Sequence, residues 1–185
     1  DGKKKLADYN RALTLQPELA IALRARGAYY IRTDNIQQAT EDLQKAAALE
    51  PDNFRVHEAL ALSLFFQSDL DQALASLNRA IELGPDRGSA YAYRAQVYLK
   101  MKRTEKALSD INRALELVAD NLSWRLLRAR IHQAAGNTRA ALDDIERVLA
   151  VDAKLLNAVE MRARVLAANG RMDEALAGLQ RAIEA

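Results

Sequence analysis

The sequence contains no cysteine, only three prolines and seven glycines among its 185 residues, and few aromatic side chains. Without cysteine it forms neither a disulfide nor a thiolate metal site. No apolar run approaches the roughly 18 residues that a bilayer-spanning helix needs. The net charge of +2 is too small for a protein that binds nucleic acid by neutralising phosphates. We therefore expect no disulfide scaffold, no membrane insertion and no nucleic-acid partner.

Catalytic motifs are missing too. The sequence has no HExxH, GxGxxG, Walker loop or nucleophile elbow. Its two histidines, His57 and His132, fall at helix positions that face a core, where packing explains an imidazole without a metal. Carboxylates are spread along helix surfaces instead of converging on a pocket. We expect no enzyme, no cofactor and no metal.

The sequence does have a repeat. Three stretches align without gaps, namely ATEDLQKAAALEPD (39–52), ALASLNRAIELGPD (73–86) and ALSDINRALELVAD (107–120). Their starts are 34 residues apart, and related stretches begin at residues 5, 141 and 175. Self-similarity at this period is typical of stacked helical hairpins that bury their apolar faces on their neighbours.

The repeat resembles tetratricopeptide repeat (TPR) arrays over essentially the whole chain. Small residues at repeat position 20, large apolar residues at 24, alanine at 27 and proline at 32 carry the resemblance. These are Ala39, Ala73, Ala107, Ala141 and Ala175; Tyr9, Leu43, Leu77, Ile111, Ile145 and Leu179; Ala12, Ala46, Ala80, Ala114 and Ala182; Pro17, Pro51 and Pro85. Lys5, Val148, Ala119 and Ala153 depart from the pattern. The resemblance implies an all-α fold, an α–α superhelix (a right-handed solenoid of 34-residue helical hairpins).

In this register the chain is a single array. Residues 1–19 supply the second helix of a truncated repeat, and residues 156–185 form a nearly complete final one. The full repeats are 20–53, 54–87, 88–121 and 122–155. We expect the chain to be a piece of a longer protein.

Two features of the repeats predict polar contacts. Arginine at position 7 and aspartate at position 23 predict ion pairs within a hairpin, although both could instead be solvated surface charges. The pairs are Arg26–Asp42, Arg94–Asp110 and Arg128–Asp144, whereas one repeat has Leu60 with Ser76 and the last has Arg162 with Gly178. The predicted helix caps are Asp52, Asp86 and Asp120 before first helices, and Asn35 and Asp69 before second helices.

In TPR proteins, repeat positions 2, 5, 9 and 13 of the first helices, flanked by 6 and 12, line a concave groove where partner peptides bind. Phe66 at position 13 is expected to point into this groove, and Phe65 to pack between neighbouring first helices. The predicted groove residues are Arg24, Arg32, Arg55, Leu62, Phe66, Tyr93, Gln96, Leu99, Arg130 and Arg164. Their arginines suit a partner with acidic as well as apolar side chains. The lysine and asparagine set that binds chaperone tails is not reproduced.

The leading hypothesis is a non-catalytic protein–protein interaction scaffold that binds a peptide segment of a partner in its concave groove. The alternative is a regulatory or assembly arm of a larger enzyme, secretion or transport protein, which contacts its own domains or forms a homo-oligomer through the array ends. RNA binding, as in pentatricopeptide arrays, is disfavoured by the low net charge. The excess of arginine over lysine resembles bacterial TPR proteins, so we expect a soluble protein of the bacterial cytoplasm or periplasm.

Overall fold

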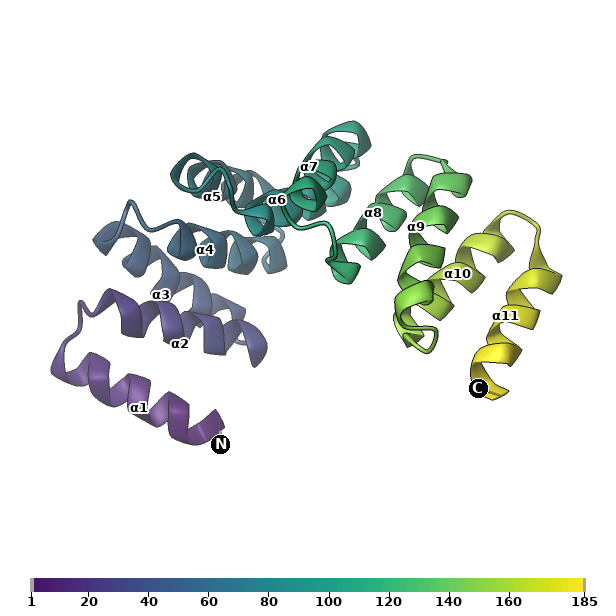
Figure 1. Cartoon of the computed structure of the whole chain (residues 1–185). Coiled ribbons are helices and arrows are strands. Elements are labelled where there is room, and N and C mark those ends of the chain that lie inside the picture. Colours follow the sequence, from purple (N-terminus) through teal and green to yellow (C-terminus); the bar gives the residue numbers. More distant parts are fainter. Residues whose placement is uncertain (1, 185) are drawn as a thin grey trace. The chain divides into compact units, whose positions relative to one another are not determined.

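The computed structural model describes residues 2–184, with side chains through residue 183. In this range the chain forms eleven helices and no strand (Figure 1). The helices are α1 (Gly2–Leu15), α2 (Ala20–Arg32), α3 (Ile36–Leu49), α4 (Phe54–Phe66), α5 (Leu70–Leu83), α6 (Gly88–Lys100), α7 (Thr104–Leu117), α8 (Leu122–Ala134), α9 (Thr138–Val151), α10 (Leu156–Ala168) and α11 (Met172–Glu184). The all-α helical-solenoid class predicted from the sequence is confirmed.

The chain divides into two compact units, which we call unit 1 (up to Val97) and unit 2 (from Tyr98). In unit 1, consecutive helices from α1 to α5 pack on each other, and α2 also contacts α4. In unit 2, consecutive helices from α7 to α11 pack in the same way. Helix α6 contributes residues to both units. The division into repeats with the boundaries given above stays a prediction.

The core of each hairpin is built from small residues facing large ones. Ala39, Leu43 and Ala46 of α3 are all completely buried. A Cβ added at Gly27 of α2 would stand 2.7 Å from Cγ of Leu43, so α2 approaches α3 more closely than any side chain at residue 27 permits. The same three buried positions recur in later helices, at Ala73, Leu77 and Ala80, at Ala107, Ile111 and Ala114, and at Ala141, Ile145 and Val148.

Each turn between the two helices of a hairpin contains one residue in the left-handed region. These residues, spaced by the repeat, are Asp34, Ser68, Lys102, Gly136 and Gly170, with φ between 60° and 77°. The residue that follows donates its backbone N–H to the carbonyl five positions earlier, as Asn137 does to His132 at 2.8 Å. This bond closes the first helix. The sequence did not reveal the pattern because three of the five residues are not glycine.

The predicted helix caps need correction. Before α4 and α8 the caps are Asn53 and Asn121, whose side chains accept from the backbone N–H of Arg55 and Trp124. Asp52 and Asp120 lie one residue too early for this role, and Asp52 pairs with Arg79 instead, at 2.6 Å.

The two caps predicted for second helices have opposite outcomes. Asp69 accepts from the backbone N–H of Gln72 at the start of α5, as predicted. The prediction for Asn35 is wrong, because its side chain donates backward to the carbonyl of Thr33 and leaves the first turn of α3 without a side-chain cap. Asp86, predicted to cap α6, lies 3.6 Å from Arg87 as a surface ion pair.

Two of the three predicted arginine–aspartate pairs, Arg26–Asp42 and Arg128–Asp144, form and extend further than expected. Arg26 donates to Asp42 from Nε (2.7 Å) and Nη2 (2.8 Å), and from Nη1 to Asn10 of the preceding hairpin (2.8 Å). Arg128 donates in the same way, from Nε and Nη2 to Asp144 and from Nη1 to Asn112 of the preceding hairpin. Each arginine therefore joins three helices. Arg94 donates to Asn78 in the same way, while its pairing with Asp110 of unit 2 stays a prediction.

Candidate functional site

Helices α4 and α6 form an apolar and aromatic cluster on what we call the first-helix face of unit 1. This face consists of repeat positions 2, 5, 9 and 13 of α2 and α4, with 6 and 12 on its flanks, and of positions 2, 5, 6 and 9 of α6, which lie before the end of unit 1 at Val97. Leu62 and Phe65 of α4 surround a cavity of about 10 Å³ together with Tyr93 and Gln96 of α6. A cavity of this volume holds at most one water molecule, which indicates that the side chains of α4 and α6 pack closely around it. The structure thus brings together three predicted site residues, Leu62, Tyr93 and Gln96.

The two adjacent phenylalanines differ in environment. Phe65 is half-buried against α6, whereas Phe66, at the last turn of α4, is 53% exposed. Their rings meet edge to face, with centroids 5.8 Å apart and planes at 69°. This is a favourable aromatic geometry, and it holds the Phe66 ring against a partly buried neighbour. The exposed ring is thus an apolar surface held in a defined position.

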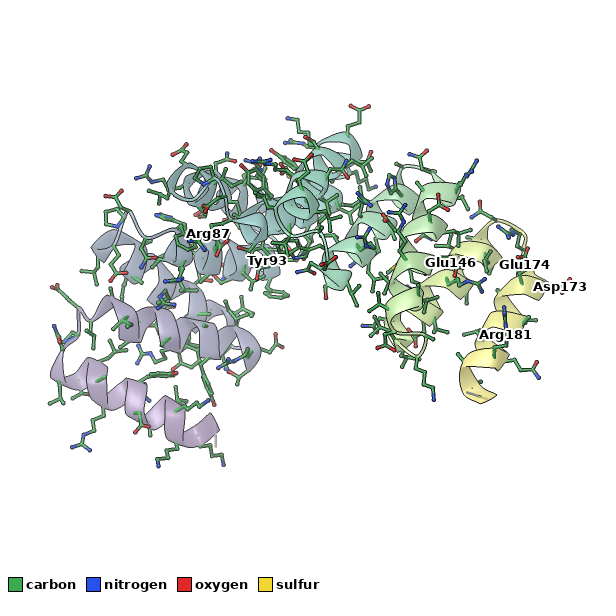
Figure 2. The ribbon with its side chains drawn as sticks, in the orientation of Figure 1. Arg87, Tyr93, Glu146, Asp173, Glu174 and Arg181 are labelled. Atoms are coloured by element: carbon green, nitrogen blue, oxygen red, sulfur yellow. The ribbon has the colours of Figure 1, made fainter. Side chains whose placement is uncertain are left out.

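Glu58 gives this face a carboxylate beside the aromatic cluster. The Ser89 hydroxyl of α6 donates to Oε1 of Glu58 at 2.5 Å. Burial raises the pKa of Glu58 above its ordinary value, although the Ser89 hydrogen bond and the charges of Arg87 and Arg55 act in the opposite direction. Burial, with a smaller contribution from the charge of Glu58, also raises the pKa of Tyr93. Figure 2 shows Tyr93 on α6 and Arg87 immediately before this helix.

The predicted arginines of unit 1 are in three different states. Arg55 lies exposed with its guanidinium 5.2 Å from the centre of the Phe54 ring, and Arg87 lies over the same ring at 5.1 Å. Arg32 is exposed at the end of α2. Arg24 is half-buried, and its buried Nε has no acceptor in the part of the chain that the structure describes. Arg24 and Arg32 therefore differ from Arg55, whose guanidinium lies over the Phe54 ring.

The remaining predicted site residues belong to unit 2. Leu99 is half-buried near the end of α6, and Arg130 is exposed on α8. Arg164 on α10 is exposed and lies 4.0 Å from Glu160. These three residues belong to unit 2, whereas the cluster around Phe66 belongs to unit 1. Their membership of one common site with Phe66 stays a prediction.

Sequence reasoning did not reveal the partners of Glu58, which occupies repeat position 5 of α4. Ser89 occupies position 2 of α6 and looked unremarkable, and Arg87 precedes the helix, outside the positions considered. The contact joins position 5 of α4 to position 2 of α6 in the next repeat, and both positions belong to the same face. The stacking of Arg87 on Phe54 required the three-dimensional fold.

Neither histidine forms a metal site with its neighbours. His57 lies 2.8 Å from the carbonyl oxygen of Pro51, and the buried Nδ1 of His132 has no partner among the described residues. Burial lowers the pKa of His132. Within residues 2–184 no group of three or more His, Cys, Asp or Glu side chains is placed to hold a metal. No helix in that range is both long and apolar enough to cross a bilayer.

Comparisons with known proteins agree with this architecture. The family model of the ETO1 C-terminal domain matches residues 63–170, more than half of the chain, and a tetratricopeptide repeat model matches residues 24–87. Among curated proteins, no sequence matches the chain.

Solved structures with the same fold include bacterial examples. YrrB, a TPR protein with an unusual peptide-binding site, is 19% identical and has a TM-score of 0.69, with 95% of this chain and 91% of YrrB covered. TTC0263, a thermophilic TPR protein of Thermus thermophilus, is 23% identical with a TM-score of 0.76 (87% and 88% covered). MamA of Desulfovibrio magneticus RS-1 is 14% identical with a TM-score of 0.77 (89% and 93% covered). At these identities the likeness concerns the fold alone.

The 34-residue period, the small-to-large packing of the hairpins and the two family models lead to one conclusion. The chain is a tetratricopeptide repeat protein, and over more than half of its length it belongs to the family of the ETO1 C-terminal domain.

Proposed function

We propose that this chain is an interaction scaffold that binds a peptide segment of a partner protein on the first-helix face of unit 1. One observation carries the proposal: Phe66 is 53% exposed, packs edge to face on Phe65 and neighbours the Leu62–Tyr93 cluster. Exposed aromatic residues beside a packed cluster are frequent binding hot spots. TPR proteins in general are non-catalytic scaffolds, which supports the same class of function.

The chemistry of this face defines the segment it fits. An apolar or aromatic side chain of the segment packs on Phe66, and we assign Gln96 the role of hydrogen-bonding to the backbone of the segment. Acidic groups of the segment pair with the guanidinium groups of Arg24 and Arg32 on α2. The first-helix face of unit 2, with Leu99, Arg130 and Arg164, binds in the same manner. Among fold neighbours, YrrB has a peptide-binding site.

The test is selection of binding peptides from a displayed random-peptide library with the wild-type chain. The best peptide is then titrated against Phe66→Ala and against Val151→Ala, a matched change at a 71% exposed apolar residue of unit 2. We expect Phe66→Ala to weaken binding by about tenfold or more, as for a hot-spot residue, and Val151→Ala to leave it unchanged. Equal affinities for the wild type and Phe66→Ala, with both folded, would reject the proposal.

A second candidate function is assembly with other copies of this chain. Its support is helix α11, where Met172, Leu176 and Ile183 are 54%, 58% and 84% exposed. Light scattering behind size exclusion tests it. Assembly predicts a mass that rises with concentration for the wild type and a monomer for Leu176→Glu, while a monomeric wild type at all concentrations contradicts it.

A further inference from the structure

Unit 2 contains a cavity of about 310 Å³ bounded by α9, α10 and α11, which we call the Arg162 cavity. Its charged lining consists of Glu146, Arg162 and Arg181, and its apolar lining includes Leu149, Val159 and Leu179. Figure 2 shows Glu146 on α9 and Arg181 on α11. The cavity belongs to a different unit from the cluster around Phe66, so nothing below depends on the proposed function.

Arg162 occupies repeat position 7, the place of Arg26 and Arg128. All three side chains are 22% exposed. In Arg26 and Arg128, Nε and both terminal nitrogens donate to an aspartate and an asparagine. In Arg162 only Nε donates, to Oε1 of Glu146 at 2.5 Å. Its two terminal nitrogens have no acceptor in the part of the chain that the structure describes, although burial there is the same.

The cause is the residue opposite Arg162. Position 23 is Asp42 in the hairpin of Arg26 and Asp144 in that of Arg128, but Gly178 in the hairpin of Arg162. The Arg162 guanidinium lies over Gly178, with Nη1 2.6 Å from where a Cβ would stand. The α10–α11 hairpin therefore lacks the position-23 carboxylate that the hairpins of Arg26 and Arg128 have. The space beside the Arg162 guanidinium is part of the cavity.

We propose that the Arg162 cavity binds a carboxylate of a ligand, which accepts from the terminal nitrogens of Arg162 as Asp42 and Asp144 do in their hairpins. We infer a carboxylate because Asp42 and Asp144 each accept two parallel hydrogen bonds from the arginine of their hairpin, a geometry specific to guanidinium and carboxylate groups. Two arginines and one glutamate line the cavity, and the carboxylate of Glu174, whose pKa the charge of Arg162 helps to lower, is also near Arg162. The cavity has room for several carbon atoms besides the carboxylate, and these pack on Val159 and Leu179. The ligand class is thus a carboxylate carrying a short aliphatic group.

The chain contains its own control. A related cavity of about 370 Å³ in unit 1 is lined by Asn10, Leu23 and Arg26. There Asp42 and Asn10 already occupy the donors of Arg26, so the account predicts no carboxylate binding at that site.

The experiment is an NMR titration of the full chain that follows arginine Nε–H signals and the Val159 and Leu179 methyls. The probes are isovalerate, a leucine-ending dipeptide with a free C-terminus, the same dipeptide amidated, and inorganic phosphate. We expect saturable shifts at Arg162 and both methyls with a carboxylate probe, none at Arg26 or Arg128, and none with the amide. Binding of isovalerate and the free dipeptide alike assigns the site to carboxylates generally, and binding of the dipeptide alone assigns it to chain termini.

Two variants separate binding from folding. Gly178→Asp supplies the missing carboxylate internally, so we expect it to weaken probe binding by about tenfold or more while the melting temperature stays or rises. Arg162→Gln should weaken binding to the same extent. The proposal is overturned if neither carboxylate produces a saturable shift, if phosphate binds more tightly than both, if the amide binds equally, or if Gly178→Asp binds as well as the wild type.

Discussion

Arg128 donates two parallel hydrogen bonds to Asp144, from Nε to Oδ2 and from Nη2 to Oδ1, both 2.7 Å long. Asp144 is 3% exposed, and Arg125 lies 3.6 Å from its Oδ1. The hydrogen bond with Asp144 is the main cause that raises the pKa of Arg128. Because Arg128 also donates to Asn112, this pair fixes α8 against both α7 and α9.

Removing the charge of Asp144 should therefore destabilise the fold. We expect Asp144→Asn to lower the free energy of unfolding by about 2 kcal/mol, because two arginines then lose a buried partner. The control is Glu82→Gln, which breaks the exposed Arg79–Glu82 pair and should cost less than about 0.5 kcal/mol. Urea denaturation measures both. Equal losses in the two variants would show that the buried pair contributes no more than a surface pair.

Two glycines predict opposite responses to alanine. A Cβ at Gly27 meets the buried Leu43 at 2.7 Å, so Gly27→Ala should cost about 1–3 kcal/mol through overpacking. A Cβ at Gly178 meets only the movable end of Arg162, so Gly178→Ala should be neutral or gain up to about 1 kcal/mol in helix propensity. Thermal or urea unfolding of the two variants decides. A stable Gly27→Ala protein would contradict the close packing of α2 on α3.

Some features of the fold could be predicted from the sequence and others could not. Period and residue size predicted the helical hairpins and the buried positions, because packing of Ala39, Leu43 and Ala46 repeats with the chain. The Arg26–Asp42 pair was also predictable, since both residues recur together. Asn10 was missed because it lies in the preceding hairpin, and the caps were misplaced by one residue because a helix start depends on backbone angles that a repeat pattern does not specify.

The caps give a direct test of that correction. The side chain of Asn121 accepts from the backbone N–H of Trp124 at 3.0 Å, whereas Asp120 is exposed and forms no cap. We expect Asn121→Ala to cost about 1 kcal/mol of unfolding free energy and Asp120→Ala to cost much less. If Asp120→Ala proves the more damaging of the two in chemical denaturation, the helix start assigned to α8 is wrong.

Glu58 predicts a pH dependence of stability. Burial raises its pKa in the folded chain above the ordinary value of 4.5. The contribution of Glu58 to the free energy of unfolding is therefore fully present at pH values below the ordinary pKa. It is lost as the pH rises through the pKa of the folded chain. Between about pH 4 and about pH 7, the free energy of unfolding of Glu58→Gln should therefore rise relative to that of the wild type. The expected rise is less than about 1 kcal/mol, because Glu58 is only half-buried. Unfolding free energies at several pH values test this, and a constant difference contradicts it.

The candidate site was predicted only in part. Helical periodicity placed Leu62, Tyr93 and Gln96 on one face, and the structure gathers them around one small cavity. The charged residues were beyond the reach of periodicity, because the contacts of Arg55 with Phe54 and of Ser89 with Glu58 depend on rotamers and on neighbouring helices. A pattern identifies a face, but it does not specify which of its charges are already paired.

The most direct test of the central claim is NMR mapping of a library-selected peptide on the isotope-labelled chain. The account predicts that the largest chemical-shift changes fall on Leu62, Phe66 and Tyr93, in α4 and α6 of unit 1. Changes concentrated on α11, or on the second helices α3 and α5, with Phe66 unaffected, would contradict it.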